Sequence, residues 1–189
     1  MPLEEASSVL DEIRRALKGG GGSSMPKEMF YVPDDGVKVI RALNEPKEST
    51  KAIMHGLYGK LMGQPCLKYY GKKCPYHKDP WRTYTVFVIT VYDYEMEQKA
   101  IWLLKATANS ALGDLISIYD ENDTIKDRDI KVTRTGKKQN TQYRAREIQH
   151  KPTKFEGKYK IPFSKDKVFK IMEGMIREPE GEKEEEEEE

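Results

Sequence analysis

The sequence predicts a mainly β protein with a few peripheral helices, and three observations carry that prediction. Residues 83–95 (TYTVFVITVYDYE) place β-branched and aromatic side chains on both alternating faces, as in a strand at the centre of a sheet. Residues 98–105 (QKAIWLLK) predict a second strand that pairs with the first across a polar turn. Residues 130–134 and 141–148 predict a hairpin, because Gly136 in the intervening TGKKQN suits a tight reversal.

Three further elements complete the main body. Residues 36–43 (GVKVIRAL) predict a first strand. Residues 109–122 change to a helical period, and we expect Asn109 to cap a helix whose apolar face is formed by Ala111, Leu112, Leu115, Ile116 and Tyr119. Residues 164–176 predict a last helix, packed on the strands through Val168, Met172, Met175 and Ile176. This order favours a small oligonucleotide-binding (OB) barrel of about five strands, with a helix between the third and fourth, over alternating β-α units.

The chain divides into three parts by composition. Residues 1–24 combine an amphipathic helix, expected over residues 3–18, with the tether GGGGSS. This leader is a helix that binds a partner, a product of cloning or a disordered segment. Residues 25–177 are expected to hold one core of ordinary size, and residues 178–189 form an acidic tail.

The charge of the chain is divided unevenly. The whole chain has a net charge of +1, but residues 178–189 contain nine Glu and one Lys, so the rest carries 32 basic and 23 acidic residues and a net charge of +9. No apolar run approaches the ~20 residues that a membrane span needs, and the first residues lack the pattern of a secretory signal. We therefore expect a cytoplasmic protein with a basic body.

Potential metal ligands gather in one short segment. Residues 54–77 hold both cysteines and two of the three histidines of the chain. His55, Cys66, Cys74 and His77 follow the pattern H-x10-C-x7-C-x2-H, and these donors suit one tetrahedral zinc ion. The segment has little apolar content, so zinc would stabilise a small subdomain over about residues 54–80. The alternative is that His55 lies on the surface and that the cysteines are small buried hydrophobic residues.

Basic and aromatic residues are interleaved in two segments, a mixture that suits unpaired nucleic acid because cations contact phosphates and rings stack on bases. The alternative is a solvated charged face. With Tyr92 of the central strand, the predicted binding residues are Lys68, Tyr69, Tyr70, Lys72, Lys73, Tyr76, Trp81, Arg82 and Tyr84 in the first segment and Arg134, Lys137, Lys138, Tyr143, Arg144 and Arg146 in the second.

From about residue 37 to residue 148 the sequence resembles the single-stranded-DNA-binding proteins of T-even-type and related tailed phages. The resemblance rests on the His-Cys-Cys cluster before an aromatic strand, on FVITVYDYE followed by a helix, and on DRDIKVTRTGKKQNTQYR, which is similar to the closing hairpin of that family. It implies an OB barrel, an inserted structural zinc subdomain with ligands His55, Cys66, Cys74 and His77, and a basic cleft for single strands. The last ligand of that family is usually cysteine, whereas His77 stands here.

The resemblance also implies a non-enzymatic role in DNA replication, recombination and repair, in the cytoplasm of the host cell. The family has an N-terminal element for cooperative self-association and an acidic tail that contacts replication proteins. Here the N-terminal segment LDEIRRALK is amphipathic, in place of the compact basic motif of that family.

Two other classes of function remain open alongside DNA binding. A nuclease would need clustered carboxylates, for which the sequence offers Asp34, Asp35, Asp127 and Asp129. Alternatively, the zinc segment is a protein-docking module, or the body binds RNA.

Overall fold

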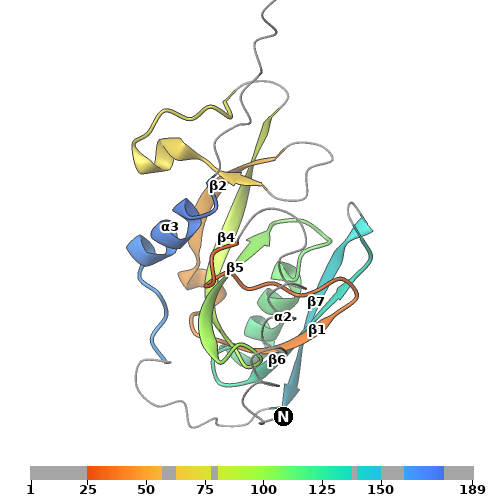
Figure 1. Cartoon of the computed structure of the whole chain (residues 1–189). Helices are drawn as coiled ribbons and strands as arrows, with labels where there is room; N and C mark the ends of the chain where they lie inside the picture. The colour runs from red at the N-terminus through yellow and green to blue at the C-terminus, as the bar shows by residue number, and fades with distance from the viewer. Residues whose placement is uncertain (1–24, 57–62, 78–80, 138–139, 150–159, 177–189) are drawn as a thin grey trace, which may run out of the picture.

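The computed structural model describes residues 25–56, 63–77, 81–137, 140–149 and 160–176. The strands are β1 (Val37–Ala42), β2 (Thr50–Gly56), β3 (Gln64–Pro65), β4 (Arg82–Asp93), β5 (Gln98–Lys105), β6 (Asp129–Thr135) and β7 (Gln142–Gln149). The helices are η1 (Pro46–Glu48), η2 (Leu67–Tyr70), α2 (Leu112–Asn122) and α3 (Lys165–Glu173), as Figure 1 shows. The mainly β class predicted from the sequence is confirmed.

The strands form one antiparallel sheet in the order β3-β2-β4-β1-β6-β7, with β5 on the other edge of β4. The long strand β4 organises this sheet. Its first part, Arg82 to Val88, pairs with β2, and its last residues, Val91 to Asp93, pair with β1 on the same edge. The opposite edge of β4 pairs with β5 along eight residues.

The sheet is not closed into a barrel, because β7 does not pair with β5 in the described part of the chain. The chain around the start of α2 occupies the free edge of β7 instead. The Tyr143 amide donates to the Asn109 carbonyl at 2.8 Å, and the Ala145 amide donates to the Asp114 carboxylate at 2.8 Å. These acceptors take the positions that a pairing strand would fill.

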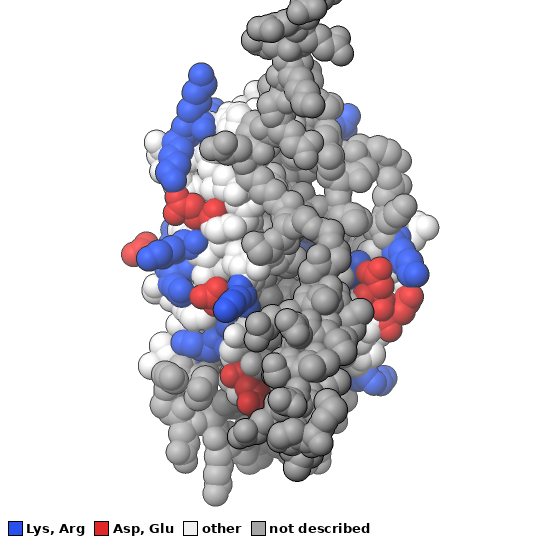
Figure 2. Space-filling model, in the orientation of Figure 1, with Lys and Arg blue, Asp and Glu red and all other residues white. Residues whose placement is uncertain are grey.

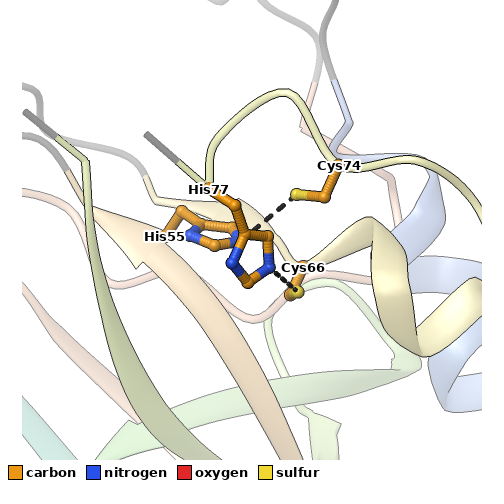
Figure 3. Close-up of side chains that lie close together, drawn as sticks. All are labelled: His55, Cys66, Cys74 and His77. Carbon is orange, nitrogen blue, oxygen red and sulfur yellow. Dashed lines mark hydrogen bonds between the residues drawn. The ribbon is translucent and has the colours of Figure 1, made fainter. Parts of the chain in front are cut away.

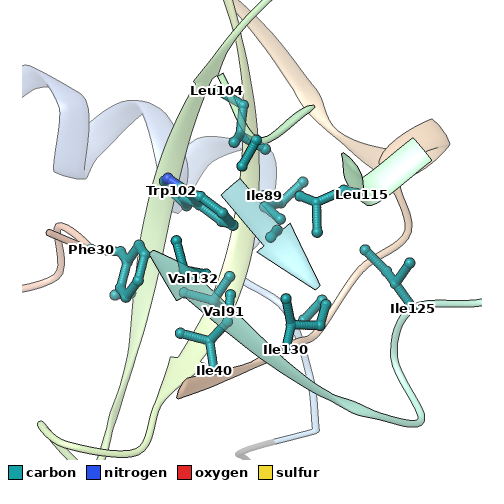
Figure 4. Close-up of a cluster of buried hydrophobic side chains, with 14 of the residues drawn as sticks. Phe30, Ile40, Ile89, Val91, Trp102, Leu104, Leu115, Ile125, Ile130 and Val132 are labelled. Carbon is teal, nitrogen blue, oxygen red and sulfur yellow. The ribbon is translucent and has the colours of Figure 1, made fainter. Parts of the chain in front are cut away.

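The two faces of β4 contribute to two separate hydrophobic clusters, as the alternation of the sequence predicts. Ile89 and Val91 join the first cluster, which lies between the sheet and α2 (Figure 4). Val86 and Val88 face the second cluster. The first cluster consists of Phe30, Val32, Ile40, Ala42, Ile89, Val91, Ala100, Trp102, Leu104, Ala111, Leu115, Ile118, Ile125, Ile130, Val132 and Ala145.

Helix α3 covers the second cluster. Val168, Met172 and Met175 are buried there as predicted, and Ile171 is buried with them. Ile176, which was also predicted to pack on the strands, is only half-buried, and it lies with Met175 beyond the end of the helix. The helix begins where Ser164 accepts a hydrogen bond from the Lys167 amide at 3.2 Å.

The structure differs from the sequence prediction in three places. The sequence did not predict β2, whose residues TKAIMHG mix charged, small and apolar types. Asn109 does not cap α2: the cap position is Ala111, and the Asn109 carbonyl accepts from β7. On α2, Ile118 is buried and Ile116 is 42% exposed, which reverses the expected role of Ile116.

The leader helix, the GGGGSS tether and the acidic tail all lie outside the described residues. None of the helices in the described ranges has the length and apolar character that a membrane crossing requires.

Candidate functional site

The four predicted metal ligands come together at one end of β2. His55 is the next-to-last residue of β2 and is fully buried. Cys66 follows β3, and its amide donates to the Ile53 carbonyl of β2 at 3.0 Å. The chain then passes through η2 and turns at Gly71, which has a left-handed φ of 67°, before it reaches Cys74 and His77. The turn brings the last two ligands back over the first two.

The geometry of the cluster suits a single ion. The donor atoms of His55, Cys66, Cys74 and His77 all lie within 4.8 Å of one another, close enough to bind a metal ion. Figure 3 shows the four side chains pointing toward one another. Cys66 Sγ lies 3.1 Å from His77 Nε2, and Cys74 Sγ lies 3.3 Å from His55 Nε2. Both cysteines are free thiols.

Burial governs the electrostatics of this cluster. Desolvation lowers the pKa of His55, and the neighbouring His77 and Lys68 lower it further. Desolvation also raises the pKa of the Cys66 thiol. The Nδ1 atom of His55 is buried and has no hydrogen-bond partner among the described residues. The two Nε2 atoms and the two sulfur atoms instead face one another, as donors to a shared cation would.

A small apolar group includes two of the four ligands. Cys66, Cys74 and Tyr76 are buried together, and the Tyr76 and Trp81 rings lie 4.7 Å apart. We call residues 63–77 the metal lobe. Its few apolar contacts are little support for a segment of this length.

The predicted nucleic-acid-binding residues of the first segment differ widely in exposure. Lys68, Tyr69, Lys72, Lys73 and Arg82 are exposed, and Lys72 forms an ion pair with Glu173 of α3. Tyr76 is buried in the metal lobe, and Trp81 is half-buried against it.

Two other tyrosines of that segment are packed against the second cluster. Burial raises the pKa of Tyr70 to about 12, with a smaller contribution from Glu173, and burial raises the pKa of Tyr84 to about 12. The Tyr70 ring contacts Phe169, and the ammonium group of Lys105 lies 4.5 Å from the centre of the Tyr84 ring. Both rings already have protein neighbours.

The second segment lies on the β6–β7 hairpin, far along the sheet from the metal lobe (Figure 1). Arg144 and Arg146 on β7 are exposed, and Lys131 on β6 stands directly opposite Arg146. Ile130, Val132 and Ala145 point into the first cluster, so these three cations point away from it. We call Lys131, Arg144 and Arg146 the basic face.

The remaining predicted residues surround this face. Lys137 is exposed in the hairpin turn, and Lys138 lies outside the described residues. Arg134 is buried and forms an ion pair with Asp34 at 2.7 Å. Tyr143 is half-buried near Arg134, and Tyr92 packs edge-on against Tyr94 with ring centres 5.4 Å apart.

Sequence reasoning missed Lys131, because its position opposite Arg146 depends on a strand register that no local pattern reveals. It also missed Tyr31, whose side chain is 47% exposed and contacts Arg134. Figure 2 shows basic and acidic side chains intermingled on the coloured parts of the visible face. The net charge of the body therefore does not show where a polyanion would bind on this face. The ion-pair partners of individual cations are more informative.

The carboxylates considered for a nuclease lie at the two ends of β6. Asp34 pairs with Arg134, and Asp35 accepts from the Gly136 amide at 3.0 Å. At the other end, Asp127 pairs with Arg128, and Asp129 accepts from Arg41 at 2.8 Å. These four groups do not form one cluster.

A cavity of about 820 Å³ lies between the end of β1, the start of β2 and the segment that leads into α3. Two of its polar lining residues are bonded to their neighbours: Asn44 accepts from the Thr90 amide, and the Thr90 hydroxyl accepts from the Phe163 amide. None of the predicted metal or nucleic-acid-binding residues lines it.

Comparisons of this chain with models of protein families, with curated proteins and with solved structures found no match.

Proposed function

We propose that this protein binds single-stranded DNA without sequence preference and coats it during replication, recombination and repair, as its resemblance to the phage proteins implies. The observation that carries the proposal is the pairing of Lys131 with Arg146 on the basic face. Like charges that face each other across an antiparallel ladder destabilise a sheet. A bound polyanion would relieve this repulsion. Each phosphate that it neutralises would also release counterions, and both effects would favour binding.

The surroundings of the basic face support this proposal. No described carboxylate forms an ion pair with Lys131, Arg144 or Arg146. Glu147 lies between the two arginines in the sequence, but it pairs with Arg128. Asp129 on β6 is engaged by Arg41 and Tyr94. Arg144 donates to the Ala108 carbonyl at 3.2 Å, which does not offset its charge, so the positive charge of this face is not neutralised by the described residues.

We further propose that the metal is one structural zinc ion. Ligand bonds of about 2.3 Å to sulfur and 2.0–2.1 Å to nitrogen place tetrahedral S and N donors about 3.6 Å apart. The two sulfur–nitrogen separations of 3.1 and 3.3 Å need only a small expansion to reach that value. Two thiols and two imidazoles are also the donor chemistry that zinc prefers. Zinc would crosslink the metal lobe to β2.

The strand connections support an OB arrangement with an open barrel. Without the β2–β3 excursion, the order along the chain is β1, β4, β5, α2, β6 and β7, so the helix falls between the third and fourth strands. β1 pairs with both β4 and β6, while β5 and β7 are the two strands left unjoined. Partly open five-stranded barrels of this kind bind oligonucleotides. The metal lobe would then be an insertion between the first two strands of the barrel.

A fluorescence-anisotropy titration with a labelled oligothymidylate tests the proposed function. We expect binding that weakens linearly in log Kd as log salt rises, weaker binding of the matching duplex, and an intact oligonucleotide after incubation with magnesium. Preferred binding of an RNA strand of the same length would favour the RNA alternative. Absence of binding to every oligonucleotide at 50 mM salt would overturn the proposal and leave the docking module.

A further inference from the structure

The side chain of Tyr31 is an exposed aromatic ring held in place by a buried cation. Tyr31 precedes β1 and is 47% exposed. The Nη1 atom of Arg134, on β6, donates to the Tyr31 hydroxyl at 2.8 Å and to the Val32 carbonyl at 2.9 Å. The Nη2 atom of Arg134 pairs with Asp34 at 2.7 Å. One guanidinium therefore fixes the segment 31–34 and the phenol that it carries.

Arg134 contacts the Tyr31 ring as well as its hydroxyl, and it leaves the residue 47% exposed to a ligand. Its guanidinium carbon lies over the ring, 5.3 Å from the ring centre, so a base would stack on the side of the ring away from this cation. Because Arg134 is buried and already paired, it is poorly placed to contact a phosphate itself. Its effect is to orient Tyr31.

The neighbourhood of Tyr31 has the chemistry of a nucleotide site. Tyr143 lies on the other side of Arg134, with its ring centre 5.8 Å from the guanidinium carbon. Lys137 follows Gly136, whose amide donates to Asp35. Arg144 follows Tyr143 in the sequence but projects from the opposite face of β7, with the rest of the basic face. Lys137 is therefore the exposed cation of the hairpin turn near the segment that carries the Tyr31 ring.

We infer that Tyr31 is a stacking platform for an unpaired nucleobase and that Arg134 is the residue that positions it. This inference rests on the proposed function, and it adds a base contact on one side of the hairpin to the phosphate contacts of the basic face on the other side. A ring held by a hydrogen bond loses little side-chain freedom when a base stacks on it, so more of the stacking energy contributes to binding.

The competing explanation is structural: Tyr31 and Arg134 anchor residues 25–36 to β6 and contact no ligand. The substitutions Tyr31→Leu and Tyr31→Phe separate the two explanations. Phenylalanine keeps the ring and loses the hydrogen bond from Arg134, whereas leucine keeps apolar bulk and loses the ring. Thermal melting of both variants reports the anchoring role.

The test measures the affinity of the full chain for an oligothymidylate and for an abasic oligonucleotide with the same number of phosphates. We expect Tyr31→Leu to weaken binding of the oligothymidylate about 5- to 150-fold, as for the loss of one stacked base. Binding of the abasic strand and the salt dependence should stay unchanged, because no cation is lost. Tyr31→Phe should bind the oligothymidylate within a few-fold of the parent.

The outcomes distinguish this inference from the proposed function. If the parent protein binds the oligothymidylate and Tyr31→Leu binds it equally well, the stacking role is wrong and the proposed function stands. Equal losses for the two strands would also overturn it, since they would show a general disturbance of the site. If the parent protein binds neither strand, both the proposed function and the stacking role fail.

Discussion

The ring of Tyr70 meets the ring of Phe169 edge-on, with centres 5.9 Å apart and an angle of 88° between the planes. Tyr70 ends η2 in the metal lobe, and Phe169 lies within α3. An ion pair between Lys72 of the metal lobe and Glu173 of α3 forms a second contact between the lobe and this helix. The metal lobe is therefore attached to the helix that covers the second hydrophobic cluster, so its order affects the core.

Removal of the metal should loosen more than the metal lobe. We expect one zinc ion per chain by elemental analysis, and a lower melting temperature after chelation because the ligands stabilise the fold only when metal is bound. Hydrogen exchange at the amides of α3 should also become faster, through the lost support of Tyr70. His77→Ala should lose the metal, while His77→Cys should retain it as a ligand-conserving control. A metal content near zero, or an unchanged melting temperature on chelation, would contradict this expectation.

Substitution of Arg146 should affect binding and stability in opposite directions. We expect Arg146→Gln to weaken DNA binding and to reduce the slope of log Kd against log salt by about one, as for the loss of one phosphate contact. The same change should raise the free energy of unfolding by ~0.2–1 kcal/mol, because it relieves the repulsion with Lys131. Lys170→Gln, at an exposed position on α3, is the matched control. A loss of stability in Arg146→Gln would show that the arginine is a structural residue.

Two adjacent residues of α2 should respond very differently to truncation. Leu115 is fully buried in the first cluster, so Leu115→Ala should lower the free energy of unfolding by ~2–5 kcal/mol. Ile116 is 42% exposed, so Ile116→Ala should change it by less than about 0.5 kcal/mol. Urea unfolding monitored by circular dichroism measures both values. Similar costs at the two positions would contradict the orientation of the helix.

The acidic tail should compete with DNA for the basic body. Deletion of residues 178–189 should increase affinity for single strands most at low salt, where the Debye length reaches ~30 Å at 0.01 M. Tethering keeps the effective concentration of the tail high, and salt screens both interactions. Replication or recombination proteins with basic surfaces would then find the tail free once DNA is bound. Equal affinities of the full and shortened chains at low salt would leave only a role in solubility.

The periodicity of apolar residues predicted those elements in which the buried positions follow a regular pattern in the sequence. The strand predictions for β4 and β5 were correct, because both strands bury apolar side chains on both of their faces. The period of α2 was correct, but its rotation was not: the sheet and η1 decide that Ile118, and not Ile116, is buried. Strand β2 was missed because His55 and Lys51 interrupt its apolar alternation.

The candidate sites also divide into residues that local sequence reveals and residues that only the folded structure brings together. The metal ligands could be predicted because cysteine and histidine are rare here and cluster in the sequence. The positions of Lys131 and Tyr31 depend on contacts between segments far apart in the chain, such as the bond from Arg134 to Tyr31 across 103 residues. Composition alone does not reveal which cations are already paired, as Arg134 is.

The 12-residue length of β4 links parts of the molecule that would otherwise behave as separate bodies. Successive residues of this one strand belong to opposite clusters, so Val88 and Ile89 occupy different cores through adjacent peptide units. A slip of one residue in the register would exchange the two sets of side chains and disrupt both cores at once. Loss of either cluster would disrupt β4, and β4 also carries side chains of the other cluster. The protein should therefore unfold in a single cooperative transition.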